Sequence, residues 1–255
     1  MAEHLVEPAA AGSKHYFLLR RLHSLTGLVP IGAYMVVHLL TNASILAGPE
    51  VFQANVDNIH LLAKLRLLTI VEWTFIFIPL IFHGVVGWFI LVEAKPNARQ
   101  YGYGANKRFS LQRITGVIAF AFIGYHVWQM HHLFAGWGGG NFDPHDAAAS
   151  AAEVIQSGWA LPLYAVGVLA CVFHLANGIW TSLITWGITV GPRSQRMSGY
   201  ACTAFGIALA LVSVGALAGF RAFDLPPVRH DTKHAAKIEQ RPALTAGAAA
   251  AANHE

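Results

Sequence analysis

Charged residues are scarce in this chain. Of its 255 residues, 12% are Asp, Glu, Lys or Arg, whereas a soluble domain carries about 25%. Cysteine is rarer still. Cys171 and Cys202 both lie inside apolar runs, so the sequence predicts neither a disulfide framework nor a cysteine-bound metal cluster. The net charge is a modest +4 and the basic residues are scattered over short loops, so no nucleic-acid partner is expected.

Apolar residues dominate instead, at 55% of the chain, and the mean hydropathy is +0.47. A bilayer core requires about 20 mostly apolar residues per helix. Five stretches qualify, at 22–45, 67–93, 111–135, 160–189 and 199–222. Because these stretches do not alternate as transmembrane strands would, we predict an all-α protein. It is an integral membrane five-helix bundle at residues 14–222, between an N-terminal extension at 1–13 and a disordered C-terminal tail at 223–255.

The basic residues of the short loops predict the orientation. Ten Lys and Arg residues lie on the side that holds the segment before the first span and the loops at 94–113 and 190–198. The opposite loops hold two, Lys64 and Arg66. By the positive-inside rule, we expect the N-terminus on the cytoplasmic side and the C-terminus outside. The basic face at 95–113 and 192–196 is expected to meet anionic membrane lipid or a docked partner.

Each of the first four spans carries one histidine in its interior, namely His38, His83, His126 and His174. Titratable groups inside a membrane are costly and usually functional, although a single one can be a hydrogen-bonded core residue. At about 1.5 Å rise per residue, His38 and His126 lie roughly 10 and 15 Å from the outer ends of their helices, and His83 and His174 roughly 25 and 22 Å. The depths therefore pair His38 with His126 and His83 with His174.

Two facing imidazoles at one depth suit a bis-histidine haem buried in an apolar bundle. Zinc is the competing metal, but it prefers four ligands clustered at one depth. Gly87 and Gly178 follow His83 and His174 by four residues. They are interpreted either as a flat surface for a porphyrin or as sites of close helix packing.

Six segments together resemble one family. They are RRLHSLTG (20–27), PLIFHGVVG (79–87), LQRITGVI (111–118), YHVW (125–128), FHLANGIW (173–180) and TWGITVGPRSQR (185–196). Their order and spacing are similar to the di-haem cytochrome b subunit of succinate dehydrogenase and fumarate reductase, of the single-polypeptide, five-helix type. The resemblance covers about residues 14–222.

The resemblance implies two b haems, a proximal one on His83 and His174 and a distal one on His38 and His126. It also implies a flavoprotein subunit with FAD and an iron–sulfur subunit on the cytoplasmic side of a bacterial inner membrane. The expected function is that of the membrane anchor of succinate:quinone oxidoreductase, respiratory complex II. In that complex the anchor carries electrons from the iron–sulfur subunit through the haems to menaquinone. The chain itself has no dinucleotide fingerprint and no cysteine set, so it does not oxidise succinate alone.

Three further residues are candidates for the site. Ser24 and Arg113 lie at the cytoplasmic ends of their spans and are expected to contact haem propionates, or else to serve as interface anchors. Glu72 lies within the second span at the depth of the distal pair. It is expected to deliver protons to a quinone, or else to form a hydrogen bond with a neighbouring helix.

Two other functions remain open at this stage. The chain could be the di-haem anchor of quinol:fumarate reductase or of another respiratory reductase, such as a nitrate reductase or a hydrogenase. It could also be a haem-free transporter whose histidines relay protons, which would show no Soret absorption band.

Overall fold

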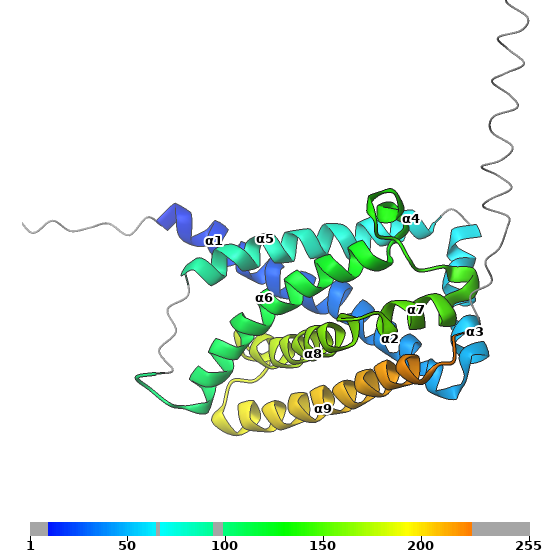
Figure 1. Cartoon of the computed structure of the whole chain (residues 1–255). Helices are drawn as coiled ribbons and strands as arrows, with labels where there is room; N and C mark the ends of the chain where they lie inside the picture. The colour runs from blue at the N-terminus through cyan, green and yellow to red at the C-terminus, as the bar shows by residue number, and fades with distance from the viewer. Residues whose placement is uncertain (1–9, 65–66, 94–98, 226–255) are drawn as a thin grey trace, which may run out of the picture. The chain divides into compact units, whose positions relative to one another are not determined.

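A computed structural model describes residues 10–64, 67–93 and 99–225, and every regular element in these ranges is helical (Figure 1). The first long helical run comprises α1 (Ala10–Thr26), a π-helical segment η1 (Gly27–Gly32) and α2 (Ala33–Ala43), and ends in a 3-10 turn at Ser44–Ala47. Pro30 lacks an N–H group, so it cannot continue the α-helical ladder, and the helix widens around it.

The second run is built in the same way. It comprises α4 (Leu68–Val71), a π-helical segment η3 (Glu72–Phe77) and α5 (Ile78–Glu93). The Ile78 N–H donates to the Trp73 carbonyl five residues earlier, just before Pro79. A proline therefore accompanies the wider turn in both runs.

Three more long helices complete the bundle, and short elements connect them. The long helices are α6 (Gly104–Met130), α8 (Ala160–Thr185) and α9 (Pro192–Ala222). The connecting elements are α3 (Pro49–Lys64), two 3-10 turns at His132–Trp137 and Pro144–Asp146, and α7 (Ala147–Gln156).

Four helical runs are long and apolar enough to cross a membrane: His15–Ala47, Leu68–Glu93, Ala160–Thr185 and Pro192–Ala222. They correspond to four of the five predicted spans. The third predicted span, 111–135, lies on α6, which is not among the four because Arg113, His126 and Gln129 lower the mean hydropathy of its apolar stretch. That predicted span also ends too late. The helix stops at Met130, because His131 has extended backbone angles and a 3-10 turn follows.

The predicted boundaries of the extension, the bundle and the tail stay predictions. The helix α1 begins at Ala10, within the predicted extension 1–13. Most of the predicted tail, residues 226–255, lies outside the described residues, as does Lys95 of the basic loop.

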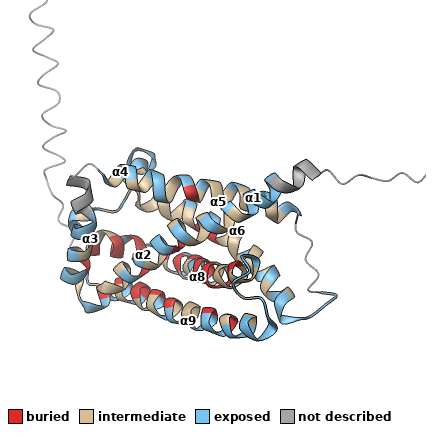
Figure 2. Ribbon diagram, turned by 180° about the vertical axis from the view of Figure 1, so that it is seen from behind, coloured by how far each residue is buried: buried red, intermediate tan, exposed pale blue. Residues whose placement is uncertain are grey.

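Helix α8 is the central helix of the bundle. Of the most apolar stretch of α8, 56% is buried, against 6% for the run that ends in α5, and Figure 2 shows buried residues on α8, along α9 and beside α3. Large apolar side chains on α5 stay exposed, among them Trp88, Phe89 and Val92. A soluble protein rarely exposes so large an apolar surface, so these faces are those that lipid would cover.

The helices α6 and α8 approach closely at one glycine. A Cβ atom on Gly167 of α8 would lie 2.1 Å from Cγ of Phe122 on α6, so only glycine fits there. Phe122 is itself buried and packs edge-to-face on Tyr164 of α8. This contact brings together the two helices that carry His126 and His174.

The helices α3 and α7 pack at the end of the bundle where α6 ends and α9 ends. Gln53 of α3 joins them, since its Nε2 donates to the Pro144 carbonyl at 2.7 Å and its Oε1 accepts from the Ala147 N–H at 2.9 Å. The sequence reasoning missed both helices. Neither contains an apolar stretch of the length that a bilayer requires, which was the criterion used to find helices in the sequence.

We predict that Gly167→Ala destabilises the protein and that Gly124→Ala does not. The first substitution forces Phe122 to move, and overpacking of this kind costs about 1–3 kcal/mol. Gly124 is a matched control on α6, because a Cβ there would meet no atom within 4 Å. Thermal unfolding of the detergent-purified complex measures both, and equal melting temperatures for the two variants would contradict the close packing.

Candidate functional site

The four histidines predicted within the spans come from four different helices and meet in two pairs. His83 of α5 and His174 of α8 have ring centroids 6.1 Å apart with their planes at 89°. His38 of α2 and His126 of α6 have centroids 5.7 Å apart with planes at 69°. These are the pairs to which the depth argument and the family resemblance both pointed. We call the first the inner pair and the second the outer pair.

Each imidazole of the inner pair is anchored by a main-chain carbonyl of the facing helix. Nδ1 of His83 lies 2.9 Å from the carbonyl oxygen of His23 on α1. Nδ1 of His174 lies 3.0 Å from the carbonyl oxygen of Gln112 on α6. A carbonyl only accepts, so both Nδ1 atoms carry the proton and donate. The Nε2 atom of each ring therefore keeps its lone pair, which is the form of histidine that ligates a metal.

The residues that supply these carbonyls also return a hydrogen bond. Nδ1 of His23 donates to the His83 carbonyl at 3.1 Å, and its ring stacks on the His83 ring with centroids 3.9 Å apart. Nε2 of Gln112 donates to the His174 carbonyl at 3.0 Å. Each inner histidine is thus held by a reciprocal pair of hydrogen bonds across a helix interface.

A glycine one turn after each of these partner residues makes room for the ring. A Cβ on Gly27 would lie 2.4 Å from His83, and a Cβ on Gly116 would lie 2.9 Å from His174. The partner and its glycine form similar pentapeptides, HSLTG at 23–27 and QRITG at 112–116. This repeat was the available sequence signal for the role of His23, and the sequence reasoning missed it.

The glycines that sequence reasoning singled out face these same partners. A Cβ on Gly87 would lie 3.0 Å from Cε1 of His23, and a Cβ on Gly178 would lie 3.6 Å from Nε2 of Gln112. Gly87 therefore lets α1 approach closely, which is the packing role that was weighed against a porphyrin surface, whereas a Cβ on Gly178 would make only an ordinary van der Waals contact.

The outer pair is held by side chains. Nδ1 of His126 lies 3.2 Å from the Tyr164 hydroxyl, and Nε2 of His38 lies 3.3 Å from Nδ2 of Asn42. Tyr164 is buried on α8 and was not singled out from the sequence, because nothing in its local pattern places it opposite His126. The outer pair thus has one ring anchored through Nδ1 and one in contact with an amide through Nε2.

The donor set fits a metal with two axial imidazoles. When each nitrogen lies about 2 Å from a shared metal, the two ring centroids are roughly 6 Å apart, close to the separation in both pairs. Within the described residues, no group of three or more His, Cys, Asp or Glu side chains comes together as a metal site. That finding favours the paired arrangement of a bis-histidine haem over a four-ligand zinc site.

Unpaired guanidinium nitrogens lie at the end of the bundle where α1 begins, α8 ends and α9 begins, which we call the basic end. Among the described residues, Nη1 of Arg21 and Nε of Arg113 are buried and lack a hydrogen-bond partner. Buried donors of this kind fit an anionic group such as a haem propionate. Ser24 lies at the same end, where its hydroxyl is 2.8 Å from that of Ser182 and accepts from Nε1 of Trp186 at 3.2 Å.

At the opposite end, Glu72 lies beside a histidine. Its Oε2 is 3.8 Å from Nε2 of His131, directly after α6, and both side chains are mostly buried. The His131 ring stacks on that of His132. The sequence analysis placed Glu72 within the second span but did not pair it with His131, because the two come from different helices.

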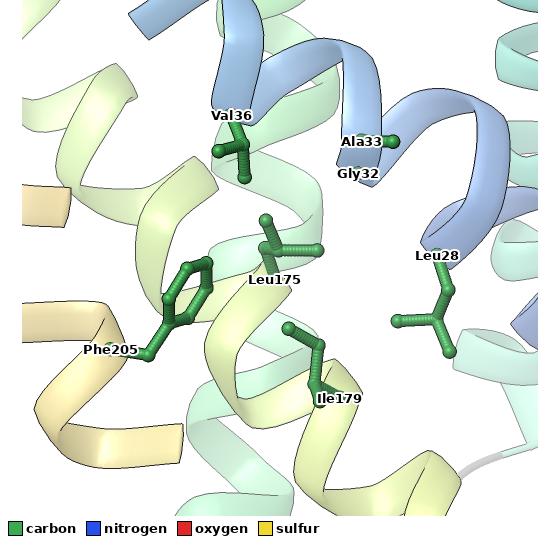
Figure 3. A pocket seen from close by; sticks show the side chains of 7 residues that line it. All are labelled: Leu28, Gly32, Ala33, Val36, Leu175, Ile179 and Phe205. Atoms are coloured by element: carbon green, nitrogen blue, oxygen red, sulfur yellow. The ribbon is translucent and has the colours of Figure 1, made fainter. Parts of the chain in front are cut away.

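An apolar cavity of about 330 Å³ lies between η1, α2, α8 and α9 (Figure 3). It is lined by Leu28, Gly32, Ala33, Val36, Leu175, Ile179 and Phe205. None of these side chains is polar, so the cavity offers no group that would orient a ligand.

The chain is similar in sequence to known membrane proteins. Residues 94–213 match the family model described as the succinate dehydrogenase/fumarate reductase transmembrane subunit. The chain is 40% identical over 204 residues to the succinate dehydrogenase cytochrome b558 subunit of Bacillus subtilis (strain 168), and the match covers 80% of this chain and 96% of that protein. With this identity, this coverage and several membrane-crossing helices, the chain belongs to the family of succinate dehydrogenase/fumarate reductase transmembrane subunits.

Proposed function

We propose that this chain is the cytochrome b membrane anchor of a succinate dehydrogenase complex and that it holds two b haems. The observation that carries this function is the pair of facing imidazoles at each of two sites, in a chain 40% identical to a cytochrome b558 subunit. His83 and His174 would hold one haem, and His38 and His126 the other.

His23 and Gln112 orient the two histidines of the inner pair. The carbonyls of His23 and Gln112 accept hydrogen bonds from the Nδ1 atoms. The Nε2 atoms of His83 and His174 therefore keep their lone pairs and would bind the metal as neutral donors. A bound haem supplies iron that carries one electron at a time. Burial among apolar helices excludes water from the ligands, and the orphaned nitrogens of Arg21 and Arg113, with the Ser24 hydroxyl, would pair with propionates.

The basic end is the side on which the soluble subunits would dock. Arg193 and Arg196 are exposed there at the start of α9, and the positive-inside rule puts this end in the cytoplasm. A flavoprotein with FAD and an iron–sulfur subunit are the partners that succinate oxidation requires, since the described helices hold no soluble domain for that chemistry. The family model covers both directions of the reaction, so fumarate reduction uses the same residues.

Menaquinone would be reduced at the opposite end, near Glu72. A quinone that accepts two electrons also takes up two protons to form the quinol. Glu72 and His131 are 3.8 Å apart, mostly buried and at the mouth of the bundle, and Nε2 of His131 has no hydrogen-bond partner within the described residues, so the carboxyl group would pass a proton and the imidazole would offer a hydrogen bond to the quinone. The alternative role of Glu72 is to link its helix to the neighbouring one, and the contact to His131 is where that link would form.

We predict that His174→Ala and His126→Ala each reduce the haem content from two to one per chain. Each substitution removes one axial ligand from a different pair. The pyridine haemochrome assay on the purified complex measures the haem, with His145→Ala as the control, because His145 is exposed in a connecting turn. If both variants retained two haems, the assignment of ligands would be wrong.

We predict that Glu72→Gln keeps both haems but lowers succinate:menaquinone turnover at least tenfold, because an amide cannot carry the proton. Succinate oxidation with an artificial acceptor at the soluble subunits should be unchanged. Glu153→Gln is a matched control, since Glu153 is exposed on α7. Unchanged quinone turnover in Glu72→Gln would leave Glu72 with only the structural role.

A further inference from the structure

The most deeply buried polar side chain among the described residues belongs to Asn177, which is 1% exposed. It lies on α8 one turn after His174 and contacts neither histidine of the inner pair by a hydrogen bond. Burying an amide without hydrogen-bond partners strongly destabilises a protein. Its hydrogen bonds therefore have to be made in one particular arrangement.

The side chains of Arg108, Asn177 and Gln112 form a chain of hydrogen bonds, here called the relay, in which each member donates to the next. Nε of Arg108 donates to Oδ1 of Asn177 at 2.8 Å. Nδ2 of Asn177 donates to Oε1 of Gln112, also at 2.8 Å. Nε2 of Gln112 then donates to the His174 carbonyl at 3.0 Å. A guanidinium group can only donate, so Arg108 fixes the orientation of the Asn177 amide, and that amide in turn fixes Gln112.

The relay also acts on the imidazole ring of His174. Gln112, whose side chain is held by Asn177, is also the residue whose carbonyl accepts the Nδ1 proton of His174 at 3.0 Å. Any rotation of the Gln112 amide would place its Oε1 against the His174 carbonyl, which repels it. The relay thus holds α6 and α8 in the register in which Nδ1 of His174 meets that carbonyl.

The far end of the relay is held by three helices. The Arg108 guanidinium of α6 lies 4.1 Å from the ring centroid of Trp180 on α8. Nε1 of Trp180 donates to the Gln195 carbonyl on α9 at 2.8 Å. Gly199 leaves the space for both groups, since a Cβ there would lie 3.2 Å from Trp180 and 3.5 Å from Arg108.

The partner histidine has no equivalent support. His23 holds His83 by the same reciprocal hydrogen bonds, but in the described part of the chain no side chain donates to or accepts from the His23 ring beyond the His83 carbonyl. The two ligands of the inner pair are therefore held by different means.

We propose that Arg108, Asn177 and Gln112 are positioning residues that fix the tautomer and the ring orientation of His174, and thereby tune one of the two haems. This role rests on the proposed function. A hydrogen bond from Nδ1 to a carbonyl makes imidazole a stronger donor to the metal, which stabilises oxidised iron. Loosening that bond raises the midpoint potential of the haem, and rotation of the ring changes the largest g value of its low-spin ferric EPR signal.

A double-mutant cycle tests this role in the purified complex, with Asn177→Ala, Gln112→Met and the double variant. These substitutions are neutral, so they add no charge near the haem. The readouts are the haem content, the EPR spectrum and a redox titration that resolves both haems. Ser213→Ala is the matched control, because Ser213 is 2% exposed on α9 and its hydroxyl bonds only within its own helix.

With two haems retained, each single variant should shift the EPR signal and raise the potential of the same one haem, and the control should shift neither. The double variant should shift that haem no further than the larger single variant, because residues that act through one chain are not additive. Additive shifts, unchanged signals, or a parallel loss of both haems would overturn the role. A complex that binds no haem even without substitutions would instead contradict the proposed function.

Should Asn177→Ala fail to accumulate, Asn177→Asp tests the same link. Its carboxylate still accepts from Nε of Arg108 and lacks the donor to Oε1 of Gln112, but it adds a negative charge, so the EPR spectrum and not the potential is the readout. A change of the EPR signal confined to one haem supports the relay, and two unchanged signals overturn it.

Discussion

The structure depends on one constraint, which is that an imidazole buried in an apolar bundle cannot leave its N–H group unpaired. For His83 and His174 the acceptor is a main-chain carbonyl of a neighbouring helix. A carbonyl inside a helix is reachable only when two helices approach closely. Gly27 and Gly116 permit that approach, so the spacing of α1 against α5 and of α6 against α8 follows from the needs of two side chains.

The rings of the two histidine pairs are held by different means. The inner pair uses main-chain carbonyls, whose positions are fixed by the helices themselves. In the outer pair the Tyr164 hydroxyl can accept from Nδ1 of His126, whereas Nε2 of His38 meets the Asn42 amide nitrogen, which only donates; both of these side chains can rotate about their own bonds. Two sites of the same ligand type are thus supported with different rigidity, which is a physical basis for unequal properties of two bound haems.

Helix α8 connects these features. It supplies His174 to the inner pair, Tyr164 to the outer pair, Asn177 to the relay and Gly167 to the contact with α6. Its burial on most sides explains why small and polar residues gather on it, while α5, which has little buried surface, carries large apolar side chains. Of the four apolar runs, the one with the largest buried share thus supplies side chains to both histidine pairs and to the relay.

The sequence by itself determined the class of the protein, the position of its long helices and the depth of the four histidines. Hydropathy reports which residues avoid water, and the constant rise of a helix converts residue number into depth. Both histidine pairings followed from that depth. Only the tertiary structure decided how each helix is rotated about its axis, and hence that His23, Gln112, Tyr164 and Asn177 face the histidines. It also decided that α6 ends at Met130 and that α3 and α7 pack across one end of the bundle. Rotation and partner choice arise from contacts between helices far apart in the chain, and no local pattern of apolar residues encodes them.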